Sequence, residues 1–211
     1  MSYTLITGAS TGIGKEFAIL CAMNQENVIL VARNSDKLES LANELRNKYA
    51  VLVEVIVADL SQAGAAKKVF EKSEAYGLVV AKLINNAGIG LNGKFIEYSL
   101  ELQMQLMQLN MNTLVELTHL YANTMRQHGG GEILNIASTA AFQAGPYMAV
   151  YYASKAFVLS FSEAIYSEFQ EEGITVTVLC PGATKTDFFN EEHNLTAPFS
   201  QCLHKRLQKL D

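Results

Sequence analysis

The sequence predicts one α/β domain, a doubly wound parallel sheet of about six strands with helices on both faces. Two observations predict it. Apolar, β-branched runs alternate with helical patterns from the first residues almost to the last, and the runs are nearly uninterrupted, as in parallel strands buried on both faces. No linker, repeat or low-complexity tract divides the 211 residues, so we expect a single domain over 1–211.

The strands and helices are expected to alternate in a fixed order along the chain. The expected strands are 3–7 (YTLIT), 27–32 (NVILVA), 51–57 (VLVEVIV), 80–85 (VAKLIN), 132–137 (EILNIA) and 174–180 (ITVTVLC). Helical patterns lie between them at 13–24, 36–48, 62–75, 100–128 and 150–172. A strand–helix repeat of this kind predicts parallel strands joined by right-handed connections.

The helices 100–128 and 150–172 are apolar on more than one face. Their apolar side chains are Leu102, Met104, Leu106, Met107, Leu109, Met111, Leu114 and Leu117, then Val150, Phe157, Val158, Leu159, Phe161, Ile165 and Phe169. One face of each helix is expected to pack on the sheet. The other face either meets a second subunit, which gives a homodimer through these two helices, or is covered by the C-terminal tail.

Composition excludes several classes of protein. Hydrophobic residues make up 49% and charged residues 18% of the chain, which excludes a disordered protein. The net charge of −5 gives no electrostatic basis for binding nucleic acid or an anionic membrane. No apolar run approaches the ~20 residues of a membrane span, and the N-terminus enters a strand without the features of a signal peptide.

Cysteine and histidine positions predict no metal site. They show no ligand spacing, at Cys21, Cys180, Cys202, His119, His128, His193 and His204. Three scattered cysteines suit a reduced cytoplasm, where we expect the protein to be located, and we interpret them as small hydrophobic residues.

A glycine turn joins the first strand to the first helix. Gly8, Gly12 and Gly14 form a G-x3-G-x-G arrangement in TLITGASTGIG. Glycines allow a tight turn and close backbone approach, and the helix N-terminus offers N–H groups to a pyrophosphate. Such a loop alone is often only a turn, but its place at the first strand–helix junction favours a dinucleotide site.

Arg33 follows the second strand, where enzymes that prefer NAD usually carry an acid that binds the ribose 2′-hydroxyl. A guanidinium suits a 2′-phosphate instead, which favours NADP. The competing acid, Asp36, lies at the start of the expected helix 36–48, where acidic side chains are common. The alternative is that Arg33 is only a surface charge.

Several polar residues fall at the carboxyl ends of strands, where doubly wound sheets bind ligands. Ser138 follows the strand 132–137, and the segment NNAG (85–88) closes the fourth strand. Asn110 interrupts an apolar helix and needs polar partners. Lys155 is four residues after Tyr151 and three after Tyr152, so spacing alone does not choose between the two tyrosines.

Together these motifs resemble the short-chain dehydrogenase/reductase family over essentially the whole chain. The matching segments are TGASTGIG (7–14), NNAG (85–88), Asn110 within LNMNT, Ser138, YYASK (151–155) and PGATKT (181–186). The resemblance implies a Rossmann fold and an oxidoreductase that transfers a hydride between NADP(H) and a carbonyl or secondary alcohol. The active tyrosine of the family's Y-x-x-x-K motif is the first residue, which implies that Tyr151 is the general acid/base and Tyr152 a neighbour.

The resemblance also implies roles for individual residues. Ser138 would hydrogen-bond the substrate oxygen, and Asn110 would position a water that links Lys155 to solvent. Lys155 would hold the cofactor ribose and, together with the oxidised nicotinamide, lower the pKa of Tyr151. Cofactor contacts are implied for Gly8, Ser10, Thr11, Gly12, Ile13, Gly14, Arg33, Asp59, Leu60, Asn86, Ala87, Gly88, Tyr151, Lys155, Pro181, Gly182 and Thr186. The alternative function is an NADP(H)-binding regulatory or interaction protein without significant turnover.

The substrate side is the least specified part of the sequence. Candidates for the pocket lining are mostly apolar or aromatic, which suggests an apolar substrate: Ile89, Leu91, Phe95, Phe142, Tyr147, Phe188 and Phe189. Family members usually add a strand and a helix after this point. We therefore expect 187–211 to be a substrate-side tail, either naturally short or truncated, and the chain to stop at a dimer where a longer one would form a tetramer.

Overall fold

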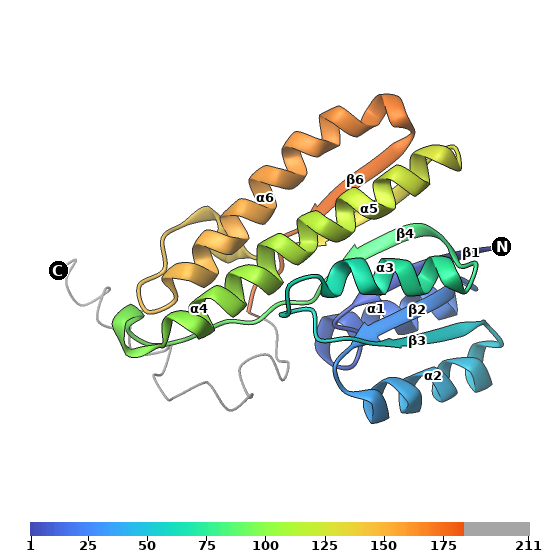
Figure 1. The fold of residues 1–211 in the computed structure, drawn as a ribbon, viewed down its shortest axis with the longest axis horizontal. Helices are drawn as coiled ribbons and strands as arrows, with labels where there is room; N and C mark the ends of the chain where they lie inside the picture. The colour runs from blue at the N-terminus through green and yellow to red at the C-terminus, as the bar shows by residue number, and fades with distance from the viewer. Residues whose placement is uncertain (184–211) are drawn as a thin grey trace.

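The protein folds into a parallel sheet with helices on both faces (Figure 1). The structure, a computed structural model, describes residues 1–183. Its strands are β1 (Ser2–Thr7), β2 (Asn27–Ala32), β3 (Val53–Val57), β4 (Val79–Asn85), β5 (Gly131–Ile136) and β6 (Ile174–Leu179). They pair in parallel in the order β3-β2-β1-β4-β5-β6, which confirms the predicted doubly wound sheet.

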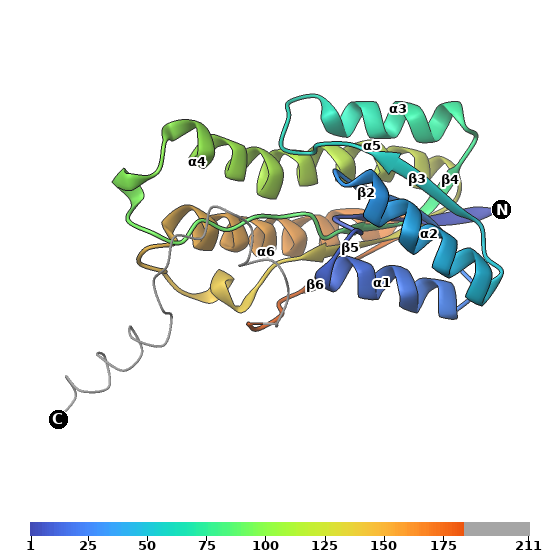
Figure 2. The same ribbon diagram turned by 90° about the horizontal axis from the view of Figure 1, so that it is seen from below.

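The helices divide between the two faces of the sheet (Figure 2). They are α1 (Gly12–Met23), α2 (Ser35–Tyr49), α3 (Ala65–Ala75), α4 (Leu100–Met107), α5 (Thr113–Gln127) and α6 (Ala149–Phe169), with short helical turns at η1 (Phe95–Glu97), η2 (Gln108–Asn112), η3 (Thr139–Phe142) and η4 (Gln170–Glu172). One core joins the sheet to α3, α5 and α6 through Val69, Leu117, Tyr121 and Ile165. The other joins it to α1 and α2. None of the described helices is long and apolar enough to cross a membrane.

Two expectations about regular elements are corrected. The segment 100–128 is not one regular helix, because the π-helical turn η2 separates α4 from α5. The helix expected from residue 62 begins at Ala65, because Gly64 before it takes a left-handed conformation with φ of +75°.

The strand 174–180 was expected to be buried on both faces, and this is also corrected. Burial alternates along β6: Ile174 and Val176 are buried, whereas Thr175, Thr177 and Leu179 are exposed. Thr175 and Thr177 are register partners of Glu132 and Leu134 on the face that carries α1 and α2. Within residues 1–183, no helix covers that face of β6.

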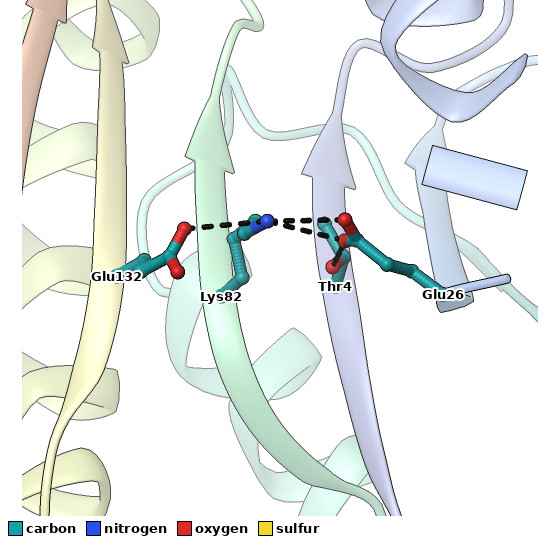
Figure 3. Close-up of polar contacts among 4 residues, drawn as sticks. All are labelled: Thr4, Glu26, Lys82 and Glu132. Carbon is teal, nitrogen blue, oxygen red and sulfur yellow. Dashed lines mark hydrogen bonds and ion pairs between the residues drawn. The ribbon is translucent and has the colours of Figure 1, made fainter. Parts of the chain in front are cut away.

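A row of polar side chains crosses the sheet on the face that carries α1 and α2 (Figure 3). Thr4, Lys82 and Glu132 are register partners on β1, β4 and β5. The ammonium of Lys82 lies 3.2 Å from a carboxylate oxygen of Glu132 and 3.2 Å from one of Glu26, and the Thr4 hydroxyl donates to Glu26 at 2.6 Å. Lys82, on a central strand, thus pairs with two carboxylates at once.

The same contacts shift the pKa values of Glu26 and Lys82. Partial burial raises the pKa of Glu26, but hydrogen bonds from Thr4 and Lys82 outweigh it and hold that pKa below the ordinary 4.5. Partial burial lowers the pKa of Lys82, but its contacts with Glu26 and Glu132 outweigh burial and raise that pKa above its ordinary value. Because the pKa of Glu26 is depressed in the folded state, its contribution to stability is present above pH 4.5 and is lost as the pH falls through the folded pKa.

We expect Lys82→Met to lower the free energy of unfolding at pH 7 by about 1–2 kcal/mol, because it leaves two carboxylates facing each other without a cation. This energy includes a reduction for screening by solvent, since the Lys82 and Glu26 side chains are 27% and 28% exposed. Lys67→Met is the control, because its partner Glu71 lies in an exposed pair on α3 and the change should cost less than about 0.5 kcal/mol. Urea unfolding measures both. Equal losses, or a Lys82→Met loss that persists at acid pH where Glu26 is protonated, would contradict this account.

Candidate active site

One cavity of about 630 Å³ opens at the carboxyl ends of the strands. Most of the predicted site residues line it: Gly8, Ser10, Thr11, Gly12, Ile13, Arg33, Asp59, Leu60, Asn86, Ala87, Gly88, Ser138, Tyr151, Lys155, Pro181 and Gly182. These residues come from seven separate segments of the chain. Gly14 and Asn110 lie behind the lining, and Thr186 lies outside the described residues.

The glycine turn after β1 is fastened to the NNAG segment after β4. The side-chain oxygen of Thr7 accepts hydrogen bonds from the amides of Asn86 and Ala87, at 2.9 and 3.0 Å. The side-chain amide of Asn86 donates to the Thr7 carbonyl at 2.9 Å. Gly8 has φ of +65°, and a Cβ there would lie 2.9 Å from the Asn86 amide nitrogen. The turn can therefore lie this close only as glycine, and it leaves room for a phosphate at the N-terminus of α1.

Two cations lie at the end of the cavity next to β2. Arg33 follows β2, and Lys37 in the first turn of α2 lines the cavity beside it. The side-chain oxygen of Asn34 caps α2 by accepting from the Lys37 amide at 2.9 Å. Asp36 does not line the cavity, so the charged side chains at this end are the two cations and Asp59, whose carboxylate is close enough to Arg33 to feel its charge.

Asp59 is held in place by its own turn. Its carboxylate accepts from the amide and the hydroxyl of Ser61, at 3.1 and 2.7 Å. Partial burial raises its pKa, but these hydrogen bonds, with a smaller contribution from the charge of Arg33, lower it overall. The side chain is therefore an ionised acceptor at neutral pH, suited to the amino and hydroxyl groups of a nucleoside.

Ser138 and Tyr151 meet on the opposite side of the cavity. Ser138 follows β5, and its side-chain oxygen accepts from the Ala140 amide at 3.1 Å, which fixes the start of η3. Burial raises the pKa of Tyr151, and the polar Ser138 side chain, which stabilises the phenolate, works in the opposite direction without outweighing it. The phenol is therefore protonated at neutral pH, with a hydroxyl beside it.

Lys155 lies behind this pair and is only 5% exposed. Its ammonium donates to the Ile136 carbonyl at 2.8 Å and lies 5.8 Å from the centre of the Tyr151 ring. Burial lowers the pKa of Lys155 to about 8. The expected lowering of the Tyr151 pKa by Lys155 is not found in the protein by itself, because the ammonium is directed at the β5 carbonyl and desolvation favours the neutral phenol.

Asn110 lies in the π-helical turn η2, and it is buried. Its side-chain oxygen accepts from the Ile89 amide at 3.0 Å, and its amide donates to the Ile89 carbonyl at 3.0 Å and to Ser154 at 3.1 Å. It therefore ties the segment after β4 to α6, directly behind Gly88 and Lys155. Its role in positioning a water stays a prediction.

The substrate candidates are divided between two places. Ile89 lines the main cavity, whereas Leu91, Phe95 and Tyr147 line a narrow hollow beside Tyr151. Phe142 is exposed and lines neither. Phe188 and Phe189 lie outside the described residues.

Sequence reasoning missed several lining residues: Lys37, Leu109, Thr139, Gln143, Met148 and Tyr152. The i, i+4 spacing of Arg33 and Lys37 across a helix start could have identified Lys37. Thr139 and Gln143 follow Ser138 on one loop, but the side chains that such a loop presents depend on its conformation.

Comparisons with known proteins agree with this geometry. A family model for short chain dehydrogenase matches residues 2–196. The 17-beta-hydroxysteroid dehydrogenase type 3 of Mus musculus is 31% identical over 210 residues, which cover 98% of this chain and 64% of the mouse protein. The 7beta-hydroxysteroid dehydrogenase of Collinsella aerofaciens is 34% identical over 182 residues, 86% of this chain and 68% of that protein.

A solved structure of a short-chain dehydrogenase from Sphingobium yanoikuyae in complex with NADPH has the same fold, with a TM-score of 0.87 at 34% identity. The match covers 93% of this chain and 76% of that one. The chain spans less than two thirds of the length of most of the curated relatives it matches.

Proposed function

Because the chain belongs to the short-chain dehydrogenase family, we propose that it is an oxidoreductase that transfers a hydride between NADP(H) and a carbonyl or secondary alcohol. The observation that carries the proposal is the protonated Tyr151 beside Ser138, with the buried Lys155 behind it, in the same cavity as the glycine turn. A protein that only binds the dinucleotide has no use for a phenol and a hydroxyl placed together, which makes the regulatory alternative the weaker one.

The cavity residues fit NADP(H) along its length. The glycine turn and the N-terminus of α1 would hold the pyrophosphate, and Arg33 with Lys37 would bind the 2′-phosphate. Asp59 and Leu60 would contact the adenine, while Pro181 and Gly182 would contact the nicotinamide half. The NADPH-bound relative from Sphingobium yanoikuyae supports this choice of cofactor.

The protein's own side chains would then orient the substrate oxygen and protonate it. When bound, the cofactor supplies the hydride in the reductive direction. Ser138 would orient the carbonyl through a hydrogen bond, and Tyr151 would donate its proton to the oxygen as negative charge develops there. Lys155, with a pKa of about 8, is largely charged at neutral pH, and would hold the ribose and favour the phenolate that remains.

The direct test is oxidation of NADPH, followed by absorbance, against a panel of ketones, aldehydes and diketones that includes apolar and steroid ketones. We expect turnover with at least one apolar ketone, since the lining beside Tyr151 is largely apolar. Tight NADPH binding without turnover of any substrate would favour the regulatory alternative.

A cytoplasmic location stays a prediction from the cysteine pattern.

We also propose a homodimer through 100–128 and 150–172. Met104 on α4 and Phe157 on α6 are 53% and 39% exposed in the single chain, and Phe157 stacks on Phe161 with ring centres 5.8 Å apart. Apolar side chains presented this way are suited to a two-fold interface.

Light scattering across a concentration series is expected to give a dimer. Phe157→Glu should raise the dimer dissociation constant by about tenfold or more, because it puts a charge in place of a ring that the proposed interface would bury. Tyr76→Glu, at an exposed site on the end of α3, should leave it unchanged. A wild-type protein that stays monomeric would contradict the proposed interface, and a stable tetramer would show that a dimer is not the limit.

A further inference from the structure

Two loops meet beside Tyr151. One, 89–99, follows β4, and the other, 143–148, joins η3 to α6. Tyr151 and Met148 line both the main cavity and the narrow hollow between the loops. The separation of the two loops therefore affects what can approach the phenol.

Tyr152 supports the second loop with its ring. A Cβ placed on Gly145 would overlap three carbon atoms of that ring, so the ring lies directly against the Gly145 backbone. The same ring meets Tyr151 edge to face, with ring centres 6.0 Å apart and an interplanar angle of 77°. One aromatic side chain thus touches both the loop and the reactive tyrosine.

Tyr98 supports the first loop in the same way. A Cβ on Gly93 would lie 2.9 Å from the nearest carbon of the Tyr98 ring. The Tyr98 hydroxyl donates to the Asn92 carbonyl at 2.9 Å, which closes the loop on itself. Each loop therefore carries a glycine packed under a tyrosine ring.

A backbone hydrogen bond joins the two loops. The Gly93 amide donates to the Tyr147 carbonyl at 2.8 Å. Tyr147 has φ of +68°, a left-handed conformation that is costly for a residue with a Cβ. The loop keeps this conformation between the Gly93 bond on one side and a bond from the Met148 amide to the Gly145 carbonyl, at 3.1 Å, on the other.

We propose that Tyr152 and Tyr98 are positioning residues whose rings, packed on Gly145 and Gly93, set the gap between the two loops and so the size of the ketone substituent that reaches Tyr151. The predicted effect on substrate size rests on the proposed reductase function, whereas the predicted effect on the spacing of the two loops does not. The contact is made by the Tyr152 ring, so its hydroxyl is not required.

Losing the Tyr152 ring should release the second loop. Gly145 would lose its packing partner, Tyr147 could return to an ordinary backbone conformation, and the bond from Gly93 would be lost. A wider gap should bind small ketones less tightly. Bulky ketones should then react better relative to small ones, because fewer side chains restrict their entry.

The test compares Tyr152→Ser, which removes the ring, with Tyr152→Phe, which keeps it. Hydrogen exchange of the Gly93 amide should be roughly fivefold to tenfold faster in Tyr152→Ser, the loss of about one hydrogen bond, and unchanged in Tyr152→Phe. In kinetics with cyclohexanone and a diaryl ketone, Tyr152→Ser should raise KM for cyclohexanone by about fivefold with kcat within about twofold. Preference for the diaryl ketone should rise accordingly.

Two further variants keep the result interpretable. Gly145→Ala should accelerate Gly93 exchange through the same contact, which decides the inference if Tyr152→Ser fails to fold. Tyr76→Ser, at an exposed site on the end of α3, should change neither measurement. Unchanged Gly93 exchange in both Tyr152→Ser and Gly145→Ala would overturn the proposal, as would a Tyr152→Phe that behaves like Tyr152→Ser. Failure of the wild-type protein to reduce any ketone would instead count against the proposed function, because the exchange measurement needs no turnover.

Discussion

Tyr151→Phe is expected to lower kcat by about 10²–10⁴-fold and to leave NADPH affinity within about twofold of the wild-type value. The change removes one hydroxyl and almost no volume. That hydroxyl lies in the same cavity lining as the Ser138 hydroxyl, and it is the protonated group that would supply a proton to the substrate oxygen. Turnover is measured by NADPH absorbance and affinity by isothermal titration.

Tyr152→Phe is the matched control for that prediction. It removes the same hydroxyl oxygen from the next residue of α6. The Tyr152 ring, which packs on Gly145, is kept. We expect it to retain most activity. A dead Tyr152→Phe beside an active Tyr151→Phe would reverse the assignment, and two active variants would remove the phenol from the mechanism.

Arg33→Ala is expected to lower NADPH affinity by about tenfold or more and to leave NADH affinity nearly unchanged. A guanidinium at the end of β2 can bind a 2′-phosphate through two hydrogen bonds, whereas NADH carries no such group. Lys37→Ala should have the same direction with a smaller effect of about threefold to tenfold, since an ammonium acts as a point charge. Isothermal titration with both cofactors measures the ratio.

Asp36→Ala is the control for the cofactor prediction, because Asp36 lies next to Lys37 in sequence but does not line the cavity. It should leave the ratio of NADPH to NADH affinity unchanged. Equal losses of both cofactors in Arg33→Ala would mean that Arg33 supports the loop near Asp59 and does not bind the phosphate.

The strands were predictable because nearly every one is a continuous apolar run between two layers of helices. Each lies within two residues of its expected bounds. The glycine turn and NNAG were predictable for a related reason: they fall where parallel strands end, so topology alone brings them to one edge. The choice of Tyr151 over Tyr152 came from the family resemblance, since both spacings from Lys155 fit one helix face.

Other features depend on contacts that no sequence pattern encodes. The π-helical turn at Asn110 follows from hydrogen bonds to Ile89, a residue on a different segment. The direction of the Tyr151 pKa depends on how deeply the phenol is buried and on where Lys155 points. The exposed face of β6 depends on how far the helices of the described chain extend across the sheet.

The central claim is that this cavity carries out hydride transfer, and labelled cofactor tests it most directly. NADPH carrying deuterium at the transferable position of the nicotinamide would be incubated with the wild-type protein and the best ketone from the panel, and the alcohol analysed by mass spectrometry. The account predicts one deuterium on the carbinol carbon of the wild-type product, and at most about 1% as much labelled alcohol from Tyr151→Phe in the same time. Bound NADPH with no labelled alcohol from the wild-type protein, or equal labelled product from Tyr151→Phe, would contradict it.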